Sequence, residues 1–171
     1  MYGLKAGMVK DLYLVFQFQN KLAMERSGII DLLLVEDNPS DAELIIRALR
    51  KQNINNSYRI IKDGAEALDF LFCRGNYTGR NIDHRPRVIF LDLKIPKISG
   101  LEVLGALRCE PKTASIPVVV LTSSQEYADV RAAYNLGVNS YVVKPLDYES
   151  LSNAISQAGS YWLQLNHVPF R

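Results

Sequence analysis

The chain has 171 residues, of which 48% are hydrophobic and 22% are charged, a composition typical of one globular domain with a sizeable core. It carries 20 basic and 18 acidic residues, a net charge of +2, and no basic run interleaved with aromatic residues indicates a nucleic-acid groove. The 2 cysteines and 2 histidines lie outside any metal-binding spacing, which favours free thiols in a reducing cytoplasm and excludes a zinc or disulfide framework.

The first part of the chain is predicted to be a loosely attached extension, residues 1–28, in which Met24 is an alternative start of the compact domain. Its apolar patch at 12–16 is too short to span a bilayer, and no small-residue cleavage pattern follows it. We therefore expect no membrane partner and a cytoplasmic protein. The domain is expected at 29–166, followed by a tail at 167–171, with no room for an output domain.

Along the chain, short apolar runs alternate with segments whose apolar residues recur at helical spacing. Strands are expected at 30–35, 58–61, 88–91, 116–121 and 140–143. Helices are expected from Pro39 to before Asn53, from about 65 to 73, from about 101 to before Glu110, from about 125 to 136, and over 151–165. This order predicts an α/β fold with a doubly wound, five-stranded parallel sheet of flavodoxin-like order 2-1-3-4-5 and helices on both faces.

One connection is longer than most in such folds. Residues 74–87 are polar and rich in Gly and Asn, and they follow the second predicted helix. Long loops in compact domains are often functional or mobile, and a tolerated surface insertion is an equally good interpretation.

The polar residues that end the predicted strands fall at one edge of the sheet: Glu36, Asp37, Asp92, Thr122 and Lys144. Carboxylates at one edge repel one another unless a cation is present. Mg²⁺ prefers oxygen ligands and is commonly held by one or two carboxylates and a phosphate, whereas zinc would require His or Cys ligands.

With such a metal, Asp92 is suited to attack phosphorus and form an acyl phosphate. The transferring group then needs its oxygens neutralised, and the metal, the Lys144 ammonium and the Thr122 hydroxyl are the groups available to do so. The pattern thus predicts a phosphoacceptor carboxylate.

These residues together resemble the receiver domain of two-component response regulators, over about residues 30–162. The resemblance is carried by the pair Glu36-Asp37, by Asp92 followed by Pro96 and Gly100, by Thr122 after an apolar strand, and by Lys144-Pro145. In place of the usual Met of this family stands Ile95, which should repack the loop without changing the chemistry.

The resemblance implies a role for each matched position. Asp92 is the phosphoacceptor. The ligands of Mg²⁺, for which Mn²⁺ could substitute, are Glu36, Asp37, Asp92 and the backbone carbonyl of Lys94. The phosphoryl-stabilising residues are Lys144 and Thr122, the switch residues are Thr122 and Tyr141, and the Lys144–Pro145 peptide is expected to be cis so that the chain turns sharply while aiming Lys144 at Asp92.

The long loop, the apolar tail and the expected lack of an output domain are similar to the stand-alone receivers of bacterial and cyanobacterial phytochrome histidine kinases. The implied partners are a histidine kinase, with phytochromes among the candidates, and a downstream protein target. A homodimer is expected through the fourth helix, the fifth strand and the fifth helix, with tyrosines at 127, 134, 148 and 161 as candidate contacts. No nucleic-acid partner is expected.

Three alternatives are weaker. A phosphatase of the aspartyl-phosphate type would need an acid two places after its nucleophile, where this chain has Lys94. We therefore expect no enzyme that acts on external substrates. The expected function is a phosphoacceptor that assists its own phosphorylation and dephosphorylation. A flavodoxin-like cofactor binder would need a phosphate-binding loop after the first strand, where the chain has Asn38-Pro39-Ser40 after two acids. An unphosphorylated scaffold is disfavoured because all key side chains are present.

Overall fold

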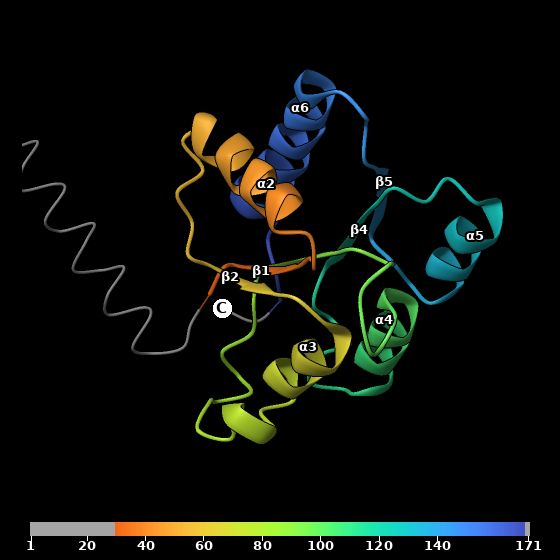
Figure 1. Cartoon of the computed structure of the whole chain (residues 1–171). Helices are drawn as coiled ribbons and strands as arrows, with labels where there is room; N and C mark the ends of the chain where they lie inside the picture. Colours follow the sequence, from red (N-terminus) through yellow and green to blue (C-terminus); the bar gives the residue numbers. More distant parts are fainter. Residues whose placement is uncertain (1–29, 170–171) are drawn as a thin grey trace, which may run out of the picture.

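The structure is a computed structural model and describes residues 30–169 (Figure 1). The predicted extension at 1–28, including the alternative start at Met24, lies outside the described residues, as do residues 170–171 of the predicted tail. The boundaries drawn there stay predictions.

Five parallel strands form one sheet in the order β2-β1-β3-β4-β5, which confirms the predicted fold (Figure 1). The strands are β1 (Leu32–Val35), β2 (Tyr58–Ile61), β3 (Val88–Leu91), β4 (Val118–Thr122) and β5 (Ser140–Val143). The fourth strand begins two residues later than expected, after Pro117, whose ring nitrogen has no hydrogen to donate to a ladder.

Helices cover both faces of the sheet (Figure 1). They are α2 (Pro39–Lys51), α3 (Gly64–Leu71), α4 (Gly100–Cys109), α5 (Tyr127–Asn135) and α6 (Tyr148–Gly159), with a short 3₁₀ turn η1 (Gly75–Tyr77) and a π-helix η2 (Ser160–Leu165) that continues α6. The last helix thus starts before the expected residue 151, because Asp147 caps it by accepting the Ser150 N–H at 2.8 Å.

Two apolar cores result, one on each side of the sheet. On one side, Leu34 and Phe90 of the sheet pack with Ile45 of α2 and Ile155 of α6. On the other side, alternate residues of the same strands pack with α3, α4 and Ala133 of α5. Strands buried on both faces explain why their sequences are continuously apolar rather than alternating.

Side-chain caps fix where helices begin. The Asn38 carboxamide oxygen accepts the Ser40 N–H at 2.9 Å, and Pro39 occupies the first turn of α2. Ser99 and Glu102 form a reciprocal capping box at the start of α4. Each cap lies in the loop that follows a strand, so these helices begin at the edge of the sheet where the strands end.

The long loop at 74–87 packs against α3. The Arg80 guanidinium lies 3.5 Å from the centre of the Phe70 ring, and the Tyr77 hydroxyl donates to Glu66 at 2.6 Å. These contacts anchor the loop to a neighbouring helix. Within residues 30–169, no helix is long and apolar enough to cross a membrane.

Candidate functional site

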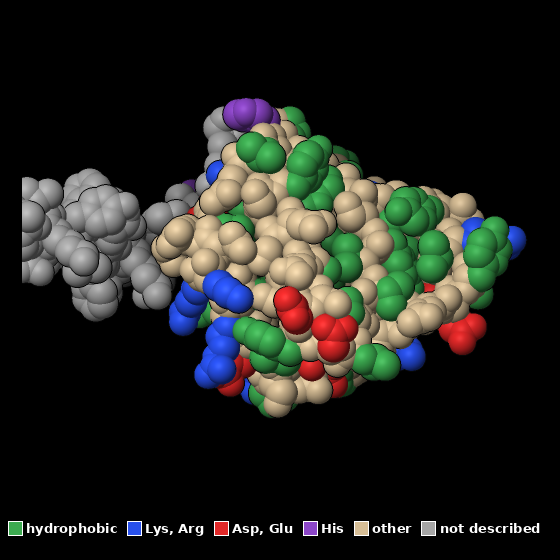
Figure 2. All heavy atoms as spheres, turned by 90° about the horizontal axis from the view of Figure 1, so that it is seen from above, with side chains coloured by type: hydrophobic (Ala, Val, Ile, Leu, Met, Phe, Trp, Pro, Cys, Tyr) green, Lys and Arg blue, Asp and Glu red, His purple; other side chains and the backbone are tan. Residues whose placement is uncertain are grey.

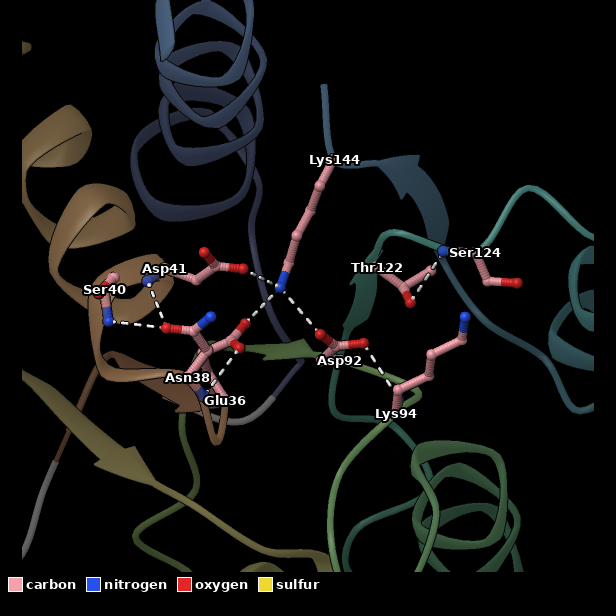
Figure 3. A network of polar contacts seen from close by, with 9 residues as sticks. All are labelled: Glu36, Asn38, Ser40, Asp41, Asp92, Lys94, Thr122, Ser124 and Lys144. Atoms are coloured by element: carbon pink, nitrogen blue, oxygen red, sulfur yellow. Dashed lines mark hydrogen bonds and ion pairs between the residues drawn. The ribbon is translucent and has the colours of Figure 1, made fainter. Parts of the chain in front are cut away.

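Two buried carboxylates mark the carboxyl edge of the sheet (Figure 3). Glu36 directly follows β1 and is 2% exposed, and Asp92 directly follows β3 and is 7% exposed. Because β1 and β3 are adjacent in the sheet, their strand ends place these two acids side by side.

The Lys144 ammonium lies between them. It directly follows β5, and its Nζ is 2.6 Å from Glu36 Oε2, 2.8 Å from Asp92 Oδ2 and 3.0 Å from Asp41 Oδ2 (Figure 3). Only 8% of the lysine side chain is exposed. Since an ammonium carries three N–H donors, its donors match the three carboxylates.

This arrangement shifts the pKa values of all three central groups. Burial raises the pKa of Glu36 above its usual value in spite of Lys144. Burial opposes ionisation of Asp92 too, but hydrogen bonds from Lys144 and from the Lys94 N–H, 3.0 Å from Oδ1, hold the pKa of Asp92 below its usual value. For Lys144, burial is outweighed by its carboxylate partners, which raise its pKa. Asp92 is therefore ionised at neutral pH.

Thr122 and Tyr141 are linked through Ser124. Thr122 is fully buried, and its hydroxyl oxygen accepts the Ser124 N–H at 3.3 Å. The half-buried Tyr141 donates its hydroxyl hydrogen to the Ser124 carbonyl at 3.1 Å, and the Ser124 hydroxyl donates to Asp129 of α5 at 2.6 Å. A chain of contacts thus runs from the sheet edge to α5.

The expectation of a cis peptide before Pro145 is wrong. The peptide bonds of residues 30–169 are all trans, including Lys144–Pro145. The expectation rests on a chain that must turn sharply while aiming Lys144 at Asp92. The long lysine side chain reaches Asp92 with the following peptide bond trans, so no cis bond is needed.

The structure adds two residues that the sequence did not single out. Asp41 contacts Lys144 from the first turn of α2, and Ser124 connects Thr122 with Tyr141. The only signal for Asp41 is an acid in the first turn of a helix that starts at this edge, a position that helix-dipole effects also favour. Asp37, by contrast, is exposed, and its side chain makes no hydrogen bond or ion pair among the described residues.

The donor set suits a hard divalent cation. Glu36, Asp92 and Asp37 offer carboxylate oxygens, and two of them already converge on a cation, the Lys144 ammonium. Within residues 30–169, no group of three acidic, His or Cys side chains is arranged to hold a metal ion, and Glu36 and Asp92 are both paired with Lys144.

Comparisons with known proteins agree with this geometry. Residues 32–156 match the model of the response regulator receiver domain. The chain is 41% identical over 138 residues to the probable methanogenesis regulatory protein FilR2 of Methanothrix harundinacea, covering 81% of this chain and 86% of that protein. It is 38% identical over 138 residues to the response regulator Rcp1 of Synechocystis, covering 81% of this chain and 92% of that protein.

Solved structures share the fold. The Mn²⁺-bound form of Rcp1 has a TM-score of 0.75 at 38% identity, covering 81% of this chain and 97% of that one. The phosphorylated cyanobacterial phytochrome response regulator RcpA has a TM-score of 0.76 at 34% identity, covering 82% of this chain and 99% of that one.

Proposed function

The chain belongs to the response regulator receiver domain family, and we propose that it accepts a phosphoryl group from a histidine kinase on Asp92 and signals through a protein surface that phosphorylation changes. The observation that carries this proposal is the Asp92 carboxylate, buried yet ionised, at 2.8 Å from the Lys144 ammonium. An ionised carboxylate is the nucleophile that acyl phosphate formation needs, and the ammonium is placed to offset charge on phosphoryl oxygens.

The proposal includes a divalent metal, Mg²⁺ with Mn²⁺ as a substitute. Glu36, Asp37, Asp92 and the backbone carbonyl of Lys94 would hold it, and the Mn²⁺-bound form of Rcp1 supports the binding of a divalent metal. When bound, the metal would neutralise charge on the transferring phosphoryl group. The protein's own part is to keep Asp92 ionised and to bring Lys144 and Thr122 to the same edge.

Incubation with acetyl phosphate tests the nucleophile. Intact-mass measurement should show the gain of one phosphoryl group with magnesium and no gain after chelation. Asp92→Asn should abolish the gain, whereas the matched variant Asp83→Asn, on the surface loop beside Lys112, should keep it. A gain in Asp92→Asn, or one that chelation leaves unchanged, would contradict the nucleophile or the metal.

We propose a phytochrome histidine kinase as the phosphodonor and the cytoplasm as the place of action. The phosphorylated phytochrome response regulator RcpA, 34% identical over most of its length, supports this pathway. Phosphotransfer rates from a purified phytochrome histidine kinase and from an unrelated histidine kinase test it. Faster transfer from the unrelated kinase would contradict the phytochrome assignment.

We further propose that the protein is a phosphoacceptor rather than an enzyme acting on external substrates, and that its output is a homodimer formed through α5, β5 and α6. In support, apart from Ile60 of β2, the large exposed apolar side chains of the described residues lie on α5, in the loop before α6, on α6 and on η2: Tyr127, Tyr134, Leu146, Tyr148, Tyr161 and Leu165. Apolar side chains extend across this side of the molecule in Figure 2. The link from Thr122 through Ser124 to Tyr141 and Asp129 would connect phosphorylation to this face.

A further inference from the structure

One of the three carboxylates around Lys144 has no part in the proposed chemistry. Asp41 comes from α2, and its Oδ2 is 3.0 Å from the ammonium nitrogen. Glu36 and Asp92 take up the other contacts, so the three donors of the ammonium are matched by three acceptors. In this state the ammonium has no N–H left for a phosphoryl oxygen.

Asp41 and Thr122 lie on opposite sides of the ammonium (Figure 3). A phosphoryl group on Asp92 that also meets the Thr122 hydroxyl would therefore lie on the side away from Asp41. For Lys144 to follow that group, its ammonium has to move away from Asp41. The contact belongs to the unphosphorylated state.

We propose that Asp41 is a positioning residue that holds Lys144 in the unphosphorylated arrangement, and that breaking this ion pair is part of phosphoryl transfer to Asp92. The inference rests on the proposed function of Asp92. A contact made in the starting state and lost in the transition state slows a reaction. Because Asp41 is 33% exposed while Lys144 is 8% exposed, the pair is only partly shielded from water, and we expect an effect of roughly two- to fivefold.

The contact itself is tested without phosphorylation. Nuclear magnetic resonance of lysine labelled with nitrogen-15 reports how fast the Lys144 ammonium hydrogens exchange with water. Asp41→Asn should speed this exchange, since one acceptor loses its charge. The matched variant Glu43→Gln removes a charge from the same helix, but Glu43 pairs with Arg47 at 2.8 Å, so the exchange should stay as in the wild type.

The functional consequence is tested by the initial rate of phosphorylation from acetyl phosphate at saturating magnesium. Asp41→Asn should raise this rate roughly two- to fivefold, and Glu43→Gln should leave it unchanged. Loss of a negative charge near the site would also favour an anionic donor without any role for Lys144. The same pair of measurements in a Lys144→Gln background separates the two causes, because a residue that acts through Lys144 has no effect once Lys144 is gone.

Each outcome decides. A faster Asp41→Asn variant whose advantage disappears in the Lys144→Gln background supports the inference. An unchanged or slower Asp41→Asn variant overturns it, as does an advantage that persists without Lys144. If the wild type gains no phosphoryl group at all, the proposed function of Asp92 is wrong. If the wild type is phosphorylated and Asp41→Asn is phosphorylated at the same rate, only the inference about Asp41 is wrong.

Discussion

A lysine ammonium enclosed by carboxylates neutralises charge that would otherwise oppose folding. Glu36 and Asp92 are almost fully buried, and each is paired with Lys144 at under 3 Å. Removing one partner of a buried ion pair lowers the stability of the fold, because the remaining charge stays buried away from water and loses its attraction to the opposite charge. The same residue that we place in the chemistry thus also stabilises the edge of the sheet.

Lys144→Met should lower the free energy of unfolding at pH 7 by roughly 1–3 kcal/mol, because two buried carboxylates lose their counter-ion. Urea denaturation in the absence of divalent metal measures this. Lys97→Met is the matched control, since Lys97 is 65% exposed in its pair with Asp63 and should cost less than about 1 kcal/mol. Adding Asp92→Asn to Lys144→Met should recover stability, and a further loss would contradict this account.

Asp63 gives a pH-dependent prediction. It caps α3 by accepting the Glu66 N–H at 2.8 Å and pairs with Lys97 at 2.6 Å. Burial raises the pKa of Asp63, but the hydrogen bond and charge of Lys97 and the hydrogen bonds from backbone N–H groups of α3 together lower it further, so the pKa of Asp63 lies below its usual value. A carboxyl whose folded pKa is lowered stabilises the fold above its unfolded pKa, about 4, and loses that contribution as the pH falls through the folded value.

We therefore expect Asp63→Ala to cost about 1 kcal/mol of unfolding free energy at pH 7, as loss of a helix cap commonly does. The difference from the wild type should shrink as the pH falls below about 4. Denaturation at pH 7 and pH 3 measures both values. A difference that grows on acidification would mean that the ionised carboxylate is not the stabilising form.

At the scale of elements, α4 lies close against the strand end that carries Asp92, the proposed phosphoacceptor. A Cβ on Gly100, the first residue of α4, would lie 2.3 Å from the Asp92 carbonyl oxygen and 2.7 Å from the Leu93 Cα. These are backbone atoms, which cannot turn aside as a flexible side chain can. The close approach therefore requires glycine at this position.

Gly100→Ala should destabilise the fold by roughly 1–3 kcal/mol and slow phosphorylation of Asp92, because the strand end must move. Gly105→Ala on the same helix is the matched control. Its Cβ would meet only Leu136 Cδ2 at 3.6 Å, an ordinary contact, so replacing a helical glycine should stabilise by roughly 0.5–1 kcal/mol. Thermal denaturation of both variants measures the contrast, and equal effects would show that α4 tolerates a shift.

The sequence predicts a site residue well when the end of a strand positions it, and poorly when the packing of a helix on the sheet positions it. The side chains of Glu36, Asp92, Thr122 and Lys144 meet because residues that follow parallel strands share an edge, which the apolar runs alone reveal. The sequence does not predict the contact of Asp41 with Lys144, because this contact depends on how α2 packs on the sheet.

The spacing of apolar residues along the sequence also fails to predict two other features of the structure. Apolar residues up to Leu165 recur as in one continuous helix, but the chain changes to a π-helix at Ser160, where Leu163 is buried and Leu165 is exposed. The connection between Thr122 and Tyr141 through Ser124 uses backbone groups, which carry no sequence signal.

On the scale of the whole molecule, the two edges of the sheet differ in character. Edge strand β2 exposes Arg59 and Ile60, a mixed polar and apolar edge. The region beyond β5 exposes several tyrosines and the fully exposed Leu146. An apolar surface of this kind favours a protein partner over water, and a second copy of the chain presents the same surface in return.

The last prediction concerns that surface. Sedimentation at tens of micromolar protein, with and without acetyl phosphate, should show a dimer that phosphorylation strengthens, on the order of micromolar affinity or tighter. Tyr148→Asp should weaken the dimer by about tenfold or more, as loss of a central aromatic contact commonly does. The substitution leaves α6 intact because an acid in the first turn of a helix is favourable.

Ile60→Lys is the matched control, since it places a charge on the exposed edge strand at the other end of the sheet, where lysine is well tolerated. It should leave the dimer unchanged. A monomer in both phosphorylation states would remove the dimer while leaving the chemistry of Asp92 in place, and equal weakening by Tyr148→Asp and Ile60→Lys would move the interface away from α6.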